Sequence, residues 1–337
     1  MTPTSSAASL ALKGLGLTVA LGAAVTAGAV VEARIGFQLR EHTLPVLPAG
    51  SRPVQILHLS DFHLLPSMKA KSRWIARLAE RDIDMVVNTG DNMASCQSFA
   101  LVMETLEPFL SLPGAFVFGS NDYYGPTWKN PLRYLLPPSR RADLSDSDRT
   151  LLPAETLAES LRAAGWHDLR NTTALLNVAG TRMQLVGVDD PHIDRDAMPV
   201  ASRDELDPRA DLTLGLTHAP YTRVLDQFAA LGTDLVLAGH THGGQVGVPG
   251  YGALVTNCDL PSWRASGLQA WPGVHPSLVD APVVPWHRLR PQPKGLSPCD
   301  MWVNISAGLG TSPYAPIRLF TRPEASLLTL TARENVA

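Results

Sequence analysis

The chain has 337 residues, of which 45% are hydrophobic and 18% are charged. This composition excludes a disordered, collagen-like or coiled-coil protein, because it supplies enough apolar side chains for a large core. The 28 basic and 31 acidic residues give a formal net charge of −3, which disfavours a protein that relies on a broad basic surface to bind nucleic acid. Cys96, Cys258 and Cys299 are odd in number and far apart, so they predict neither a disulfide framework nor a thiolate zinc site.

An uncharged run lies near the N-terminus, at residues 14–31. As a helix it would rise about 27 Å, enough to cross the hydrocarbon core of a bilayer. Its Ala27-Gly28-Ala29 also resembles a signal-peptide cleavage site. We predict that residues 1–34 form a membrane anchor or signal segment, and we favour a retained anchor. Residues 35–52 are predicted to be a linker, because the stretch 41–52 contains two prolines and a glycine, and one domain is predicted over 53–337.

In the domain, apolar runs and helical patterns alternate, which indicates an α/β fold with a parallel sheet and helices on its faces. The predicted helices are 69–81 and 99–110. Between them and after them, strands are predicted over 54–60, 85–88, 115–118, 174–178, 183–188, 212–216, 235–238, 303–306 and 327–331. Residues 121–151 are predicted to be a long irregular insertion, and residues 263–286 a long loop.

Polar clusters follow five of the predicted strands at the point where each strand ends. They are Asp61-Phe62-His63, Gly90-Asp91, Gly119-Ser120-Asn121-Asp122, His218 and Gly239-His240-Thr241-His242. Ligands of open α/β sheets bind outside the carboxyl ends of the strands, so we expect these clusters to meet at one rim. A lone Asp after a strand usually caps a helix, and a lone His is usually structural. Five clusters together favour a metal site, and Gly-His-Thr-His-Gly-Gly is the hardest of them to explain otherwise.

The expected ligands are carboxylates, imidazoles and an amide, with no thiolate. This set suits divalent ions such as Mn²⁺, Zn²⁺ or Fe²⁺ and disfavours Cu(I) or an iron–sulfur cluster. Seven such side chains are too many for one tetrahedral zinc ion, and they suit two ions that share a bridging carboxylate.

In their order and spacing these motifs resemble those of the calcineurin-like metallophosphoesterase superfamily. The chain is further similar to its bacterial branch of membrane-anchored or exported phosphoesterases, through Gly187-Val188-Asp189-Asp190, GHTHGGQ from Gly239, SAGLGTS from Ser306 and Arg322-Pro323-Glu324. The resemblance implies a four-layer α/β/β/α sandwich and a metal-bridging hydroxide that attacks phosphorus in line. It also implies one metal on Asp61, His63, Asp91 and His242, and a second on Asp91, Asn121, His218 and His240.

The third motif departs from the family pattern Gly-Asn-His-Asp. Aligned on the glycine, Ser120 replaces the metal-binding Asn; aligned on the amide, Asn121 keeps the metal and Asp122 replaces the His. We prefer the second alignment, because an amide oxygen coordinates better than a hydroxyl. In both alignments the family histidine near the scissile phosphate is missing. Asp122 is then a candidate acid if burial raises its pKa, His192 is a second candidate, and a substrate whose leaving group needs no acid is a third explanation.

These patterns predict a membrane-anchored binuclear hydrolase of phosphoric monoesters or diesters, whose substrate is a small phosphorylated molecule or a lipid- or envelope-linked one. The resemblance weakly favours an extracytoplasmic location for the domain, although long domains cross membranes regardless of flanking charge. The altered third motif keeps an alternative open, a metal-stabilised binding or scaffold domain without catalysis. Nucleic acid is not an expected partner, because no long basic tract follows the motifs, and the sequence carries no signal for oligomeric state.

Overall fold

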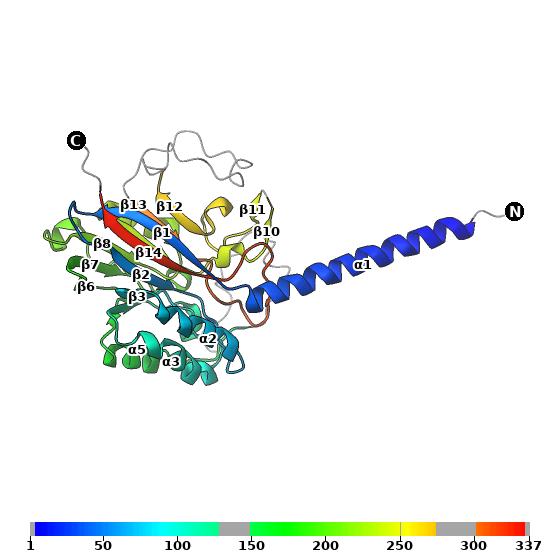
Figure 1. Ribbon diagram of the computed structural model, residues 1–337, viewed down its shortest axis with the longest axis horizontal. Helices are drawn as coiled ribbons and strands as arrows, with labels where there is room; N and C mark the ends of the chain where they lie inside the picture. Colours follow the sequence, from blue (N-terminus) through cyan, green and yellow to red (C-terminus); the bar gives the residue numbers. More distant parts are fainter. Residues whose placement is uncertain (1–3, 128–148, 250, 274–300, 334–337) are drawn as a thin grey trace.

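The computed structural model describes residues 4–127, 149–249, 251–273 and 301–333 (Figure 1). Over these residues the chain forms two mixed six-stranded sheets, a small hairpin and several helices. The first sheet has the order β1-β14-β2-β3-β4-β5. Its strands are β1 (Gln38–Leu47), β14 (Glu324–Ala332), β2 (Val54–Leu59), β3 (Met85–Asn88), β4 (Gly114–Phe116) and β5 (His167–Asp168).

The second sheet has the order β12-β13-β9-β8-β7-β6. Its strands are β12 (Gly267–Trp271), β13 (Met301–Ile305), β9 (Leu235–Ala238), β8 (Leu212–Leu216), β7 (Thr181–Gly187) and β6 (Thr172–Val178). The hairpin pairs β10 (Gly247–Val248) with β11 (Gly252–Ala253). The helices are α1 (Thr4–Ile35), α2 (Lys69–Ala76), α3 (Phe99–Leu106), α4 (Ser120–Tyr123), α5 (Ala154–Ala163) and α6 (Thr222–Ala230).

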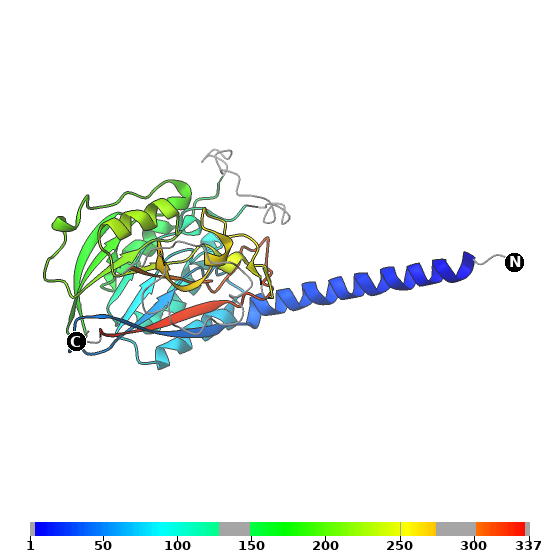
Figure 2. The same ribbon diagram turned by 90° about the horizontal axis from the view of Figure 1, so that it is seen from above.

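Strand β2 shows how the sequence produces the packing. Successive side chains of a strand point to opposite faces, so Val54 and Ile56 join the apolar cluster between the two sheets, whereas Leu57 and Leu59 join the cluster beneath α2, α3 and α5. On the far side of the second sheet, α6 packs Val224, Leu225 and Phe228 onto the strands. The two sheets are therefore stacked, with helices on both outer faces (Figures 1 and 2).

The strands that precede the polar clusters are confirmed. Strands β3, β8 and β9 have the predicted bounds, and β2 and β4 lie within two residues of theirs. The pairs β2–β3, β3–β4 and β8–β9 are parallel. Because parallel strands end at the same edge, each sheet presents its polar clusters at one rim.

The predicted linker over 35–52 is wrong for most of its length. Residues 38–47 form β1, which pairs in parallel with β14 at the edge of the first sheet. Leu44 and Leu47 are fully buried. The prolines suggested a linker, but an edge strand tolerates Pro45, because one side of its backbone needs no partner in the sheet.

The predicted loop over 263–286 is also corrected in part, since residues 267–271 form β12, antiparallel to β13. The rest of that loop from residue 274, and residues 128–148 of the predicted insertion, lie outside the described residues. The remainder of the insertion includes α4, which begins directly after Gly119.

Helix α1 projects from the domain as a single rod (Figures 1 and 2). Residues 16–35 are the one segment, among the described residues, that is long and apolar enough to cross a membrane. A signal sequence would satisfy the same criterion. At its C-terminal end, Ala29 and Ala33 are buried against the domain.

Candidate metal centre

Five predicted ligands have backbone conformations that residues other than glycine rarely adopt. The φ angles of Asp61, His63, Asp91, His240 and His242 are 53°, 42°, 57°, 69° and 51°. A non-glycine residue in this left-handed region costs of order 1–3 kcal/mol, and such strain gathers at functional sites. Each of these residues lies just after a strand, where the tight turn aims its side chain back over the rim.

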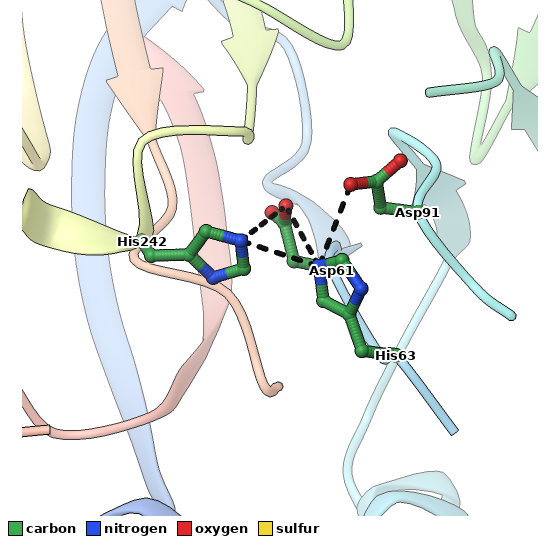
Figure 3. Close-up of side chains that lie close together, drawn as sticks. All are labelled: Asp61, His63, Asp91 and His242. Carbon is green, nitrogen blue, oxygen red and sulfur yellow. Dashed lines mark hydrogen bonds and ion pairs between the residues drawn. The ribbon is translucent and has the colours of Figure 1, made fainter. Parts of the chain in front are cut away.

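Four side chains converge at this rim (Figure 3). Asp61, His63, Asp91 and His242 are buried, and each offers a ligand atom within 4.8 Å of the others. His63 Nε2 lies 3.2 Å from His242 Nε2 and 3.4 Å from Asp91 Oδ2. His242 Nε2 lies 3.6 Å from Asp61 Oδ1. Two imidazole nitrogens and two carboxylates at such distances surround a space that suits a divalent cation.

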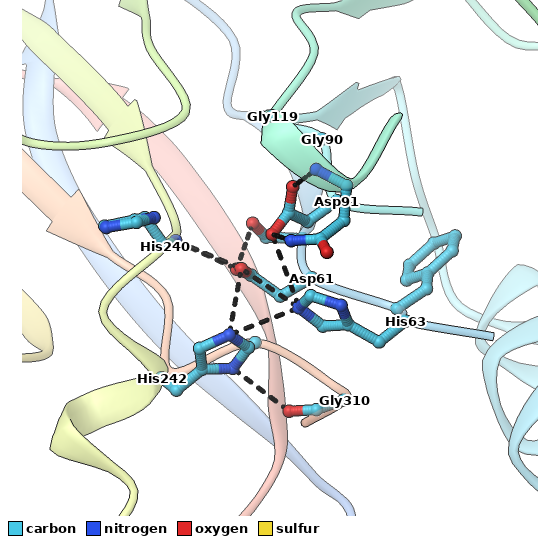
Figure 4. A network of polar contacts seen from close by, with 12 residues as sticks. Asp61, His63, Gly90, Asp91, Gly119, His240, His242 and Gly310 are labelled. Atoms are coloured by element: carbon cyan, nitrogen blue, oxygen red, sulfur yellow. Dashed lines mark hydrogen bonds and ion pairs between the residues drawn. The ribbon is translucent and has the colours of Figure 1, made fainter. Parts of the chain in front are cut away.

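Backbone carbonyls fix which nitrogen of each histidine faces the centre. The Nδ1–H of His242 donates to the carbonyl of Gly310 at 3.0 Å, as Figure 4 shows. The Nδ1–H of His218 donates to the carbonyl of Thr89 at 2.7 Å. In the neutral form of both rings the lone pair is then on Nε2. Metal-binding histidines commonly have their other ring nitrogen held in this way, because the bond fixes the ring and its tautomer.

The protonation of these groups also suits a cation. Burial lowers the pKa of His63 to about 4 and lowers the pKa of His242 well below its usual value, so both rings are neutral at pH 7. Burial opposes charge on Asp91 and His218 too, but the neighbouring His218 holds the pKa of Asp91 low, and Asp91 raises that of His218. His218 Nε2 is buried 3.5 Å from Asp91 Oδ2, where a second cation would replace its proton.

The remaining predicted ligands lie beside this second position. Asn121 donates from its backbone to Asp91 Oδ1 and from its side-chain amide to Asp91 Oδ2, both at 2.7 Å. The rings of His218 and His240 are 5.2 Å apart, measured between centroids. His240 Nε2–H donates to the carbonyl of Asn257 at 3.2 Å, so Nδ1 is the nitrogen that can bind a metal. All seven predicted ligands therefore gather at one rim, with Asp91 in the middle.

Asp122 faces the backbone of the second motif. Its carboxylate accepts N–H groups from Asp91, Asn92 and Gly119 at 2.7, 2.9 and 3.0 Å, as well as the Asn92 amide. These bonds hold the turn that carries Asp91. Burial and the charge of Asp91 raise the pKa of Asp122 to about 6. The hydrogen bonds favour a positioning role, and its role as an acid stays a prediction.

His192 lies next to the second half of the site. Its ring is 4.3 Å from that of His240 between centroids, and its Nδ1 lies 3.0 Å from the Tyr221 hydroxyl. It is thus near the ligands, and its catalytic role also stays a prediction.

The sequence reasoning assigned no role to three buried ionisable residues around the centre. The Arg318 guanidinium is fully buried and donates to the carbonyls of Ala307, Gly308, Gly310 and His242. Asp190 is fully buried, and its Oδ2 has no hydrogen-bond partner among the described residues. Lys71 is buried and donates to the Phe62 carbonyl at 2.8 Å. Arg318 follows the SAGLGTS stretch and interrupts an apolar segment, which is the one signal that could have identified it.

The chain is similar in sequence to known proteins. The family profile described as calcineurin-like phosphoesterase matches residues 54–244, more than half of the chain. Phosphodiesterase YaeI of Escherichia coli strain K12 is 28% identical over 218 residues, which cover 63% of this chain and 69% of that protein. An uncharacterized metallophosphoesterase of Aquifex aeolicus is 30% identical over 220 residues, which cover 62% and 70%. Purple acid phosphatase PPD1 from yellow lupin overlaps 58% of this chain and 39% of its own, with a TM-score of 0.36 and 13% identity.

Proposed function

Since the chain belongs to the calcineurin-like phosphoesterase family and is a metallophosphoesterase, we propose that it hydrolyses phosphoric diesters at a centre of two divalent metal ions. The observation that carries this proposal is the convergence of buried ligand atoms from distant parts of the chain within 4.8 Å of one another. The likeness to a relative named as a phosphodiesterase favours diesters over monoesters.

The donor set fits two ions. Asp61, His63 and His242 would hold the first, and Asn121, His218 and His240 the second. Asp91 would bridge them, because its Oδ2 lies 3.4 Å from His63 Nε2 and 3.5 Å from His218 Nε2. When bound, such ions lower the pKa of a water nucleophile and neutralise charge on the phosphoryl oxygens. Oxygen and imidazole donors suit Mn²⁺, Zn²⁺ or Fe²⁺.

The chain itself supplies rigidity and position. The Gly310 and Thr89 carbonyls keep the rings of His242 and His218 aimed at the centre, and Asp122 holds the turn of Asp91. The third motif has no imidazole at Asn121 or Asp122, so the leaving oxygen takes its proton from another group or from water. We therefore expect the greatest rates with good leaving groups, which need little protonation.

A matched pair of chromogenic substrates tests this function. We expect the purified chain, loaded with Mn²⁺, to hydrolyse bis(p-nitrophenyl) phosphate faster than p-nitrophenyl phosphate. Chelation should abolish both activities, and Asp91→Asn should remove them while the chain stays folded by circular dichroism. Hydrolysis of the monoester alone would change the substrate class to monoesters. A folded chain that binds metal but hydrolyses neither substrate would favour the alternative that the altered third motif suggests, a scaffold domain without catalysis.

We also propose that α1 stays attached as a membrane anchor. The Ala29 carbonyl accepts the backbone N–H of Arg318 at 2.9 Å, and Glu32 Oε1 accepts that of Thr321 at 2.9 Å. Arg322 donates to the Gly36 carbonyl at 2.9 Å. The C-terminal end of α1 is therefore hydrogen-bonded to the domain. Cleavage after Ala29 would cut the chain within this bonded segment, which favours a helix that stays attached. An anchored enzyme favours lipid- or envelope-linked diesters, and we place the domain on the extracytoplasmic side. Mass determination of the chain isolated from membranes would reveal a missing N-terminal segment, which would refute the retained anchor.

A further inference from the structure

An exposed apolar patch lies near the point where α1 meets the domain. It consists of Val248, Tyr251, Leu254 and Phe320, whose exposed fractions are 43%, 52%, 38% and 63%. Outside α1, the described residues contain seven exposed large apolar side chains, and these four are among them. They come from the β10–β11 hairpin and from the loop after Arg318, which are far apart in the sequence. We call them the hairpin patch.

Backbone hydrogen bonds join the hairpin patch into one structural unit. The N–H of Gly247 donates to the Leu319 carbonyl at 2.8 Å, and that of Leu319 donates to the Gln245 carbonyl at 2.9 Å. The N–H of Leu254 donates to the Val246 carbonyl at 3.2 Å. The same loop is tied to α1, because Thr321 donates to Glu32. The patch and the helix end are therefore held in a fixed relation, and Figure 1 shows β10 and β11 beside the end of α1.

Phe320 is the most exposed member of the hairpin patch, and its φ angle is 55°. This left-handed conformation is unfavourable for a residue with a side chain and is normally taken by glycine. Because most of the Phe320 side chain is exposed, its burial within the domain does little to offset this backbone strain. Such an outlier points to a contact made outside the domain.

The surroundings of the hairpin patch suit a lipid surface. A cavity of about 540 Å³ opens beside it, lined by Tyr251, Phe320, Trp263 and Glu32. Arg34 and Arg322 are exposed at the same end of the molecule. Aromatic side chains gather at the headgroup level of bilayers, and arginines there meet the lipid phosphates.

We propose that the hairpin patch inserts into the headgroup region of the bilayer that α1 enters, so that the catalytic domain rests on the membrane in one orientation. This inference rests on the proposed anchor and not on the phosphoesterase chemistry. Phe320 lies two residues after Arg318, whose guanidinium donates to the carbonyls of His242 and Gly310. The proposed membrane contact is therefore close to the residues that hold His242 in place.

Site-specific fluorescence on the full chain tests the contact. Cys96 and Cys299 are replaced by serine, while Cys258 is buried and stays. A single cysteine is placed at Phe320 or Tyr251 and labelled with an environment-sensitive NBD dye. The matched control is Leu175, whose exposed fraction is 45% and which lies in β6, at the end of the domain away from α1 (Figure 1). The labelled chains are reconstituted into vesicles of phosphatidylethanolamine and phosphatidylglycerol.

We expect the emission of the labels at positions 320 and 251 to shift to shorter wavelength on reconstitution and to be quenched by nitroxide-labelled lipid. The label at position 175 should show neither change. Labels at 320 and 251 that report the same aqueous environment as 175, in a chain that floats with the vesicles, would overturn the proposal and leave the anchor intact. A chain that does not float with the vesicles would overturn both. Phosphodiesterase activity of the same samples reports separately on the proposed function.

Discussion

Gly119 is the residue at which the smallest change should damage the metal centre most directly. Its φ and ψ are −111° and 175°, a conformation that alanine adopts without strain. A Cβ added there would lie 2.5 Å from His218 Cε1 and 2.6 Å from His218 Nε2, and nearer still to Asp91 Oδ1. Ordinary separations between nonbonded carbons are about 3.5 Å, so the ring of His218 or the Asp91 carboxylate must move by about 1 Å.

That displacement exceeds what a metal site tolerates, because ligand distances hold to within about 0.2 Å. We expect Gly119→Ala to lose at least one metal ion per chain and to reduce kcat by about 100-fold, the usual order for a 1 Å misplacement at a catalytic centre. Metal content is measured by elemental analysis, and turnover with bis(p-nitrophenyl) phosphate. The matched control is Gly28→Ala in α1, where an added Cβ meets nothing within 4 Å. A Gly119→Ala chain with full metal content and wild-type kcat would refute the placement of Asp91 and His218 at the second ion.

Three further predictions concern residues around the centre and in the hairpin patch. Arg318→Lys loses most of the carbonyl contacts beneath His242 and should weaken metal binding about 10- to 100-fold; unchanged affinity in a metal titration would contradict this role. Burial lowers the pKa of Lys71 to about 7. Between about pH 7 and pH 10 the lysine is therefore protonated in the unfolded chain and mostly neutral in the folded one. The free energy of unfolding should rise over this range by up to about 1.4 kcal/mol per pH unit. Denaturant unfolding should show that rise in the wild type and not in Lys71→Met, and parallel curves would refute the burial of a neutral lysine. Phe320→Gly should raise the unfolding free energy in detergent by about 1 kcal/mol by removing the left-handed strain, with kcat on the soluble diester unchanged, and a loss of stability would show that Phe320 packs within the domain.

Local pattern was enough to identify the ligand-bearing segments. Asp61 and Asp91 follow the neighbouring parallel strands β2 and β3, which end at the same edge of the first sheet, so their meeting follows from the alternating pattern. His218 follows β8 of the second sheet and joins them because the two sheets are stacked. The strand at 85–88 could be predicted because Met85, Val86 and Val87 form a short apolar run between Asp84 and Gly90, too short for a helix and bounded by residues typical of turns.

Two features depend on contacts between distant parts of the chain and could not be predicted from local sequence. Residues 38–47 contain two charged residues and Pro45, and they form a strand because the edge of β14 is available to them. The role of Asp122 was likewise undetermined by its neighbours, since its hydrogen bonds go to the backbone of the second motif, some 30 residues earlier.

The sequence by itself determined the kind of metal-binding chemistry, because it sets which carboxylates and imidazoles are present and in what order they occur. These donors include Asp61, His63, Asp91, His240 and His242. Only the tertiary structure decided how those donors are held. The carbonyls of Thr89 and Gly310 orient two rings, and the buried guanidinium of Arg318 gathers the loop beneath His242. Such supports are backbone groups and isolated buried charges brought together by folding, and no local spacing encodes them.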